Sequence, residues 1–241
     1  MVQMKGKVYL IGAGPGNPGL LTVEAIRTIK NVDIVLYDAL VSKSILKLIP
    51  KNVKKISVGK KKGEDSDEQQ NRINSLLYKY SSTGTRVARL KGGDPFLFGR
   101  GGEELVFLKK NKIPVKVIPG ITSAIGVPTY AGLPLTHRDY SSGVMIIPGH
   151  LKQGNIVDWE NVSKFNGTVV ILMGASTLKN IVDELIKNGK DKETPVCIIM
   201  NGTMKNQKIV KGKLCNIVEI AKREGIKAPT VTVIGKVVDL L

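Results

Sequence analysis

Short apolar runs alternate with helix-like segments through the first half of the chain, and this alternation restricts the fold more than any other feature. The apolar runs cover residues 7–11, 34–37, 55–58, 86–90 and 115–118. The segments between them, at residues 22–30, 42–49, 64–80 and 102–112, are predicted helices. Strands separated by helices in this rhythm favour a largely parallel sheet that is covered on both faces.

The pattern changes after Pro119 and Gly120. Strand candidates then fall at residues 144–147, 168–172, 196–200, 207–210 and 230–234, with helix-like segments at 123–131, 178–187 and near 217–223. The second half therefore has more adjacent strands and fewer crossover helices. We predict an α/β protein made of two α/β domains, residues 1–119 and 120–241.

The charge balance restricts the possible partners. The chain has 37 Lys and Arg against 20 Asp and Glu, which gives a formal net charge of +17. Such a field attracts anions, so nucleic acid, phosphate-rich ligands and polycarboxylates are all admissible, as is a basic surface with no binding role. Aromatic residues make up 5% of the chain and do not alternate with basic ones, which argues against a single-strand nucleic-acid platform.

The chain has only two cysteines and two histidines, which argues against a disulfide framework and against a metal cluster. The uncharged window at residues 117–135 is about as long as a bilayer span, but prolines and glycines interrupt it, which favours a buried linker and helix. We therefore predict a cytoplasmic protein with no metal site, no nucleic-acid partner and no membrane segment.

A glycine loop, residues 12–16, directly follows the first predicted strand. It is similar to a dinucleotide fingerprint, but the third glycine of that pattern would fall at position 17, which is Asn17. Pro15 also lacks the N–H that a pyrophosphate would need, and the Walker pattern is absent. The loop therefore matches neither of the two familiar phosphate-binding motifs, and a tight turn that binds no ligand is an alternative interpretation.

Two further loops follow predicted strands. Gly92, Gly93 and Asp94 come after residues 86–90, where paired glycines expose backbone and a carboxylate could accept hydrogen bonds from a ribose hydroxyl or an amino group. Residues 119–124 are predicted to form a loop that enters a helix, and the first N–H groups of a helix have no partner within that helix. Each loop alone is also consistent with a plain turn.

Three charged side chains are candidates for chemistry. Asp38 and Lys60 follow predicted strands, and Arg138 lies in a stretch rich in hydroxyl and imidazole groups, where a guanidinium could bind a carboxylate with two hydrogen bonds. Asp38 also lies where a dinucleotide fold would place its ribose carboxylate. Lys60 belongs to a lysine run that extends to Lys62, and such runs are usually solvated.

Taken in order, these motifs resemble the uroporphyrinogen-III C-methyltransferase family of the tetrapyrrole methylases. The pieces are residues 12–16, 37–42, 58–61, 91–99, 119–124, 135–141 and 172–174, and they span most of the chain. The resemblance implies two α/β domains with the active site in the cleft between them, and a homodimer. It also implies S-adenosylmethionine as methyl donor, a molecule without phosphate, which agrees with the failure of both phosphate templates.

The same resemblance assigns roles to individual residues. Asp38 would be the proton acceptor and Lys60 the proton donor, while Arg138 would bind the substrate. Thr122-Ser123 stands where related sequences often have Thr-Ala, a change that backbone contacts would survive. Contacts to the cofactor would come from Pro15, Gly92, Gly93, Asp94, Leu97, Thr122, Ser123, Met173, Gly202 and Ala228.

The implied reaction is methylation of uroporphyrinogen III at C2 and C7. It would give precorrin-2 via precorrin-1, together with S-adenosylhomocysteine, for sirohaem and cobalamin biosynthesis. The positive charge would attract this polycarboxylate, with Arg89, Lys91 and Arg100 as further candidates beside Arg138. A related enzyme acting on a later corrin precursor, an RNA or protein methylase of the same fold, and a noncatalytic nucleic-acid-binding protein remain alternatives.

Overall fold

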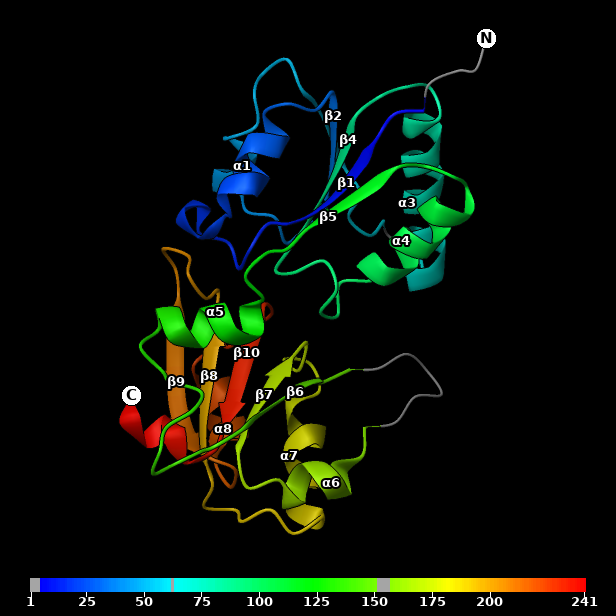
Figure 1. The fold of residues 1–241 in the computed structure, drawn as a ribbon. Helices are drawn as coiled ribbons and strands as arrows, with labels where there is room; N and C mark the ends of the chain where they lie inside the picture. The colour runs from blue at the N-terminus through cyan, green and yellow to red at the C-terminus, as the bar shows by residue number, and fades with distance from the viewer. Residues whose placement is uncertain (1–4, 62, 151–156) are drawn as a thin grey trace. The chain divides into compact units, whose positions relative to one another are not determined.

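The computed structural model describes residues 5–61, 63–150 and 157–241, so Lys62 of the lysine run lies outside the described residues. The chain divides into two compact units, Met1–Thr122 and Ser123–Leu241. The boundary expected from the sequence, between residues 119 and 120, lies just before this division. Each unit contains one five-stranded sheet (Figure 1).

The sheet of the first unit is entirely parallel, as the alternation predicted. Its strand order is β3-β2-β4-β1-β5. The sequence reasoning placed all five strands to within a few residues. Their bounds are β1 Val8–Gly12, β2 Ile34–Tyr37, β3 Lys54–Ser57, β4 Val87–Lys91 and β5 Val115–Ile118.

Helices cover both faces of this sheet, which confirms the second part of that prediction. α1 (Val23–Ile29) and α2 (Lys43–Leu46) pack on one face with a core that includes Ile11, Val35 and Leu90. α3 (Ser66–Ser81) and α4 (Gly101–Lys110) pack on the other face. Figure 1 shows α1 on one side of the strands and α3 with α4 on the opposite side. The short 3₁₀ helix η1 (Pro18–Leu20) precedes α1.

Local capping fixes where these helices begin. The Thr22 side chain accepts a hydrogen bond from the Ala25 N–H at 3.1 Å, as its predicted N-cap role requires. Asp65 caps α3 in a reciprocal arrangement in which the Glu68 side chain accepts from the Asp65 N–H. These bonds satisfy backbone donors that have no partner inside a helix, and so they determine the path of the chain between strands.

The second unit has a mixed sheet. Its order is β6-β7-β10-β8-β9, with β6 parallel to β7 and with β10 antiparallel to both β7 and β8. The strands are β6 Val144–Pro148, β7 Thr168–Leu172, β8 Pro195–Met200, β9 Lys208–Lys213 and β10 Thr230–Ile234. This arrangement agrees with the expected excess of adjacent strands in the second half of the chain.

One face of this sheet is buried under α6 (Trp159–Lys164), α7 (Leu178–Lys187) and α8 (Ile217–Arg223), whose apolar side chains join those of β7, β8 and β10 in one core. α5 (Ser123–Tyr130) packs against β7 and β10, and η2 (Lys236–Leu240) ends the chain. The sequence reasoning did not predict α6. Within the described ranges, no helix combines the length and the apolar character needed to cross a membrane.

Candidate active site

The carboxyl ends of all five parallel strands lie along one edge of the first sheet, because parallel strands all end at the same side. The loops that follow them contain the predicted catalytic and cofactor-binding residues of this unit. Pro15 follows β1, Asp38 follows β2, and Lys60 lies shortly after β3. Four predicted residues follow β4, namely Gly92, Gly93, Asp94 and Leu97, and Thr122 lies after β5.

Three glycines let the loops after β1, β4 and β5 approach one another by their backbones. A Cβ on Gly120 would lie 2.4 Å from the Gly93 carbonyl oxygen and 2.7 Å from Gly12 Cα. Gly14 has φ of 69°, and Gly14 and Gly93 exchange backbone hydrogen bonds of 3.0 and 2.8 Å. A Cβ on Gly12 or Gly120 would not fit this contact, so the loops meet main chain to main chain at the sheet edge.

Asp94 connects two of these loops. Its Oδ1 accepts from the Phe96 N–H at 2.8 Å and its Oδ2 accepts from the Gly120 N–H at 3.1 Å. A carboxylate oxygen has two lone pairs, so each oxygen retains capacity for a further donor. The structure therefore gives Asp94 a role in holding the loops together, beside the ligand contact expected from the sequence.

Asp38 forms an ion pair with a buried arginine. Its Oδ1 accepts from Arg89 Nη2 at 2.6 Å, while the Asp38 side chain keeps 26% of its surface exposed. Arg89 is 2% exposed. The carboxylate is thus fixed from the protein side and accessible from the solvent side.

Two buried cations share one buried carboxylate behind Asp38. Arg89 Nε and Lys91 Nζ each donate to Glu104 Oε1 at 2.9 Å. Every second side chain of a strand points to the same face of the sheet, so Val87, Arg89 and Lys91 of β4 all point to the face that α4 covers. Glu104 lies on the buried side of α4. Among the described residues, Glu104 Oε2 has no hydrogen-bond partner.

This network contradicts part of the sequence prediction. Arg89 and Lys91 were candidates to meet the carboxylates of a substrate, but both side chains are only 2% exposed and are paired inside the unit. Arg100 is also occupied, because its guanidinium binds Glu103 and Asp67. The sequence reasoning missed Glu104. The available signal was that two basic side chains on an apolar strand face need an acidic partner on the covering helix.

Burial and the neighbouring charges set the protonation of the two cations. Burial alone would lower the pKa of Arg89, but Glu104 and Asp38 raise it above its usual value. Burial lowers the pKa of Lys91, and the adjacent Arg89 lowers it further, against the opposing effect of Glu104 and Asp38. Arg89 is therefore the permanent cation of the network, and Lys91 holds its proton less firmly.

Lys60 lies on the loop beside that of Asp38, since β3 pairs with β2. Its side chain is exposed. Arg72 fastens this loop by donating to the Gly59 carbonyl at 3.0 Å while pairing with Glu64 at 2.7 Å. The side-chain hydrogen bond from Arg72 lowers the pKa of Glu64 to about 2, so this anchor stays charged at neutral pH.

Three other predicted cofactor contacts, Met173, Gly202 and Ala228, lie at one edge of the second sheet. β7 ends before Met173 and β8 ends before Gly202, while β10, which runs the opposite way, begins after Ala228. The Asn201 N–H donates to the Pro229 carbonyl at 3.1 Å, which joins two of these loops. Met173, Asn201 and Thr203 all have positive φ, of 58°, 50° and 67°. Backbone of this kind is costly and collects at ligand sites. Ser123 begins α5.

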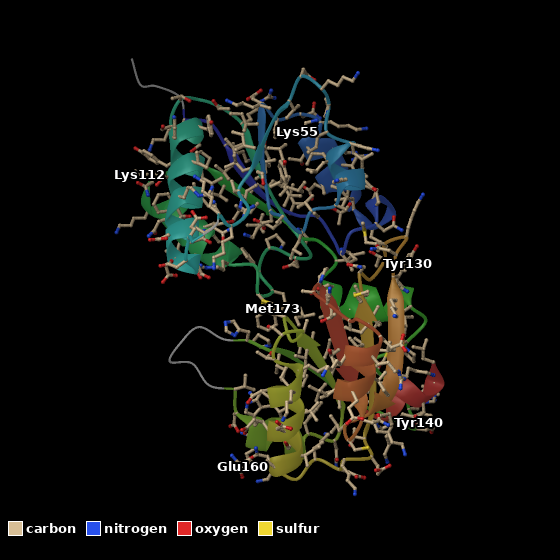
Figure 2. All side chains as sticks on the ribbon, turned by 180° about the vertical axis from the view of Figure 1, so that it is seen from behind. Lys55, Lys112, Tyr130, Tyr140, Glu160 and Met173 are labelled. Atoms are coloured by element: carbon tan, nitrogen blue, oxygen red, sulfur yellow. The ribbon has the colours of Figure 1, made fainter. Side chains whose placement is uncertain are left out.

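Arg138 does not join that group. It lies in an exposed turn closed by the His137 and Ser141 backbones, and the Thr168 hydroxyl donates to Ser141 Oγ at 2.9 Å. Thr168 begins β7, so the turn is attached at the edge opposite Met173. Figure 2 shows Tyr140, from the same turn, well away from Met173.

The three-glycine contact predicts a sharp effect of a single methyl group. Gly120→Ala should destabilise the first unit by about 1–3 kcal/mol, because backbone must move. Gly102→Ala is the control, since a Cβ there meets nothing within 4 Å. Urea unfolding measures the loss, and equal stability of the two variants would refute the packing argument.

Closely packed glycine loops, the partly exposed carboxylate of Asp38 and the exposed amine of Lys60 lie at the carboxyl edge of a doubly wound sheet. This arrangement defines the class of α/β enzymes that bind a small molecule at that edge. In the described ranges, no group of His, Cys, Asp or Glu side chains could hold a metal ion. The family model of the tetrapyrrole (corrin/porphyrin) methylases matches residues 7–218, and the chain belongs to this family.

Individual relatives agree with the family. The uroporphyrinogen-III C-methyltransferase of Methanocaldococcus jannaschii is 50% identical over 99% of both chains. A siroheme synthase of Actinobacillus pleuropneumoniae is also 50% identical, but the chain spans only 48% of that protein. The crystal structure of a Thermus thermophilus uroporphyrin-III C-methyl transferase, complexed with S-adenyl homocysteine, is 37% identical with a TM-score of 0.86, covering 98% of this chain and 100% of that one.

Proposed function

We propose that this protein transfers methyl groups from S-adenosylmethionine to C2 and C7 of uroporphyrinogen III. The products are precorrin-2, formed via precorrin-1, and S-adenosylhomocysteine. The observation that carries the proposal is that one edge of the first sheet collects the closely packed glycine loops together with Asp38 and Lys60. The names of the relatives that match nearly the whole chain support the same reaction.

The residues at the two sheet edges suit a methyl donor without phosphate. At the first edge, Gly92 and Gly93 are half-buried, and Asp94 has lone pairs left for a hydroxyl or amino group. At the second edge, Met173 is 51% exposed and offers an apolar thioether. In this proposal the donor is contacted by these residues and by Pro15, Leu97, Thr122, Ser123, Gly202 and Ala228.

The bound donor supplies an activated methyl group on a sulfonium, which an electron-rich pyrrole carbon can attack without a metal. The chain's own task is to hold the substrate carbon in line and to handle a proton. After the new carbon–carbon bond forms, the ring must lose a proton to settle its double bonds. In this scheme Asp38 accepts the one proton that the ring loses for each methyl group gained. Where a double bond shifts within the ring, Lys60 donates a proton at one position while another proton leaves the ring, so the shift adds no net proton.

Arg138 is proposed to bind a carboxylate of the substrate, although its turn lies at the other edge of the second sheet. Arg138→Ala should raise KM for uroporphyrinogen III by about tenfold, the value of one charge-assisted contact, with little change in kcat. Arg223→Ala, which removes an exposed guanidinium from the end of α8, should leave KM unchanged. An unchanged KM in Arg138→Ala would remove Arg138 from the substrate site.

A comparison of two substrates distinguishes the proposed reaction from that of a related enzyme that methylates a later corrin precursor. We expect kcat/KM to be at least about a hundredfold higher with uroporphyrinogen III than with precorrin-4, because differential contacts to a polar substrate can supply that ratio. A higher value with precorrin-4 would assign the chain to a later methylation. A homodimer, a cytoplasmic location and the absence of a nucleic-acid partner remain predictions.

A further inference from the structure

The buried ion-pair network of Arg89, Lys91 and Glu104 lies behind Asp38. Burying these charges lowers the stability of the fold, so we expect the network to have a function besides stability. Arg89, Lys91 and Glu104 are each at most 2% exposed. Removing such charges from water is expensive, and apolar side chains of similar volume often serve a core as well or better. Glu104 Oε2, with no hydrogen-bond partner among the described residues, adds a further penalty. Stability alone therefore does not account for these residues.

The charges balance only when Asp38 is included. Arg89 and Lys91 contribute two positive charges, and Glu104 contributes one negative charge. The ionised carboxylate of Asp38 supplies the second negative charge through its 2.6 Å bond to Arg89. Asp38 is also the one member of this group of four that meets solvent, with 26% of its side chain exposed.

We propose that Arg89, Lys91 and Glu104 are positioning residues that hold Asp38 as an ionised carboxylate in a fixed place at the end of β2. Arg89 makes the contact, Glu104 holds Arg89 by its other nitrogen, and Lys91 offsets the charge of Glu104. The inference rests on the proposed function, in which Asp38 accepts a proton.

The proposal predicts opposite effects from two neutral substitutions. Lys91→Met leaves a net negative network, which favours protonation of Asp38, so the acidic limb of the kcat/KM profile should move up by about one pH unit. Glu104→Gln leaves a net positive network, and the limb should move down by a similar amount. The double variant Lys91→Met/Glu104→Gln restores neutrality, and its limb should return to the position in the unmodified protein.

The exposed ion pair of Arg86 and Asp33, at 2.7 Å, is the matched control. It joins the beginnings of β4 and β2, the two strands that the Arg89–Asp38 pair joins at their other ends. Arg86→Met should leave the profile in place. S-adenosylhomocysteine binding shows which variants are folded, and the charge-balanced double variant covers the case in which a single variant is not. The proposal would be overturned if the acidic limb of the kcat/KM profile did not shift in the folded variants. It would also be overturned if the limb shifted in the same direction in both single variants.

A second readout separates this inference from the proposed function. The carboxyl carbon of Asp38 can be titrated by carbon-13 NMR in the substrate-free protein, and its midpoint should follow the same pattern of opposite shifts and rescue. If uroporphyrinogen III is not methylated but the midpoints shift as expected, the function fails and the network stands. If methylation occurs but the midpoints do not respond, the network fails and the function stands.

Discussion

The Glu104→Ala variant is expected to lower the free energy of unfolding of the first unit by about 3–5 kcal/mol. The substitution leaves Arg89 and Lys91 buried side by side without the carboxylate oxygen that both now contact. It also opens a cavity under α4, next to the wholly buried Leu108. Urea unfolding followed by circular dichroism, with the transition of the first unit fitted separately, measures the loss.

Glu103→Ala is the control for this experiment. Glu103 is the preceding residue of α4, but its side chain is 53% exposed and pairs with Arg100 at the surface. Surface ion pairs contribute about 0–1 kcal/mol, so this variant should lose no more than that. Similar losses in both variants would show that the buried position of Glu104 does not matter, and would refute the electrostatic account of the network.

The Asp38→Asn variant is expected to lower kcat by about a hundredfold or more, the usual contribution of a positioned proton acceptor. The amide has nearly the same shape as the carboxylate but cannot accept the proton. Lys60→Met should have an effect of the same order if Lys60 donates a proton. Both variants should still bind S-adenosylhomocysteine, because neither residue belongs to the proposed donor contacts.

The matched controls are Asp33→Asn and Lys55→Met, which change exposed residues at the other ends of β2 and β3. Steady-state rates of both should lie within about twofold of the unmodified protein, as for ordinary surface substitutions. A full rate in Asp38→Asn would exclude it as proton acceptor. A fall in rate matched by lost S-adenosylhomocysteine binding would contradict the assigned role as well.

Much of the fold could be predicted because local patterns carry it. The alternation of apolar runs and helices through residue 118 predicted a parallel sheet with two covered faces, and capping residues such as Thr22 marked where helices begin. Strand order could not be predicted in this way. Nothing in the runs themselves shows that β4 lies between β2 and β1, since that order depends on how the crossovers pack.

The site was predictable to the extent that it follows from strand ends. Asp38, Lys60 and the glycines were recognisable because each follows an apolar run, and parallel strands bring such positions to one edge. The need for an acidic partner of Arg89 on α4 was recognisable, but the choice of Glu104 over Glu103 was not, because it depends on how α4 is rotated against β4. The place of Arg138 was not either, because the turn that carries it is fixed by a tertiary contact between Ser141 and Thr168.

The most direct test of the central claim is the change in mass of the substrate. Purified protein is incubated anaerobically with uroporphyrinogen III and S-adenosylmethionine, and the tetrapyrrole is followed by absorbance and mass spectrometry. We expect a gain of two methyl groups, with one S-adenosylhomocysteine released for each. No gain in mass, in protein that binds S-adenosylhomocysteine, would contradict the assigned substrate.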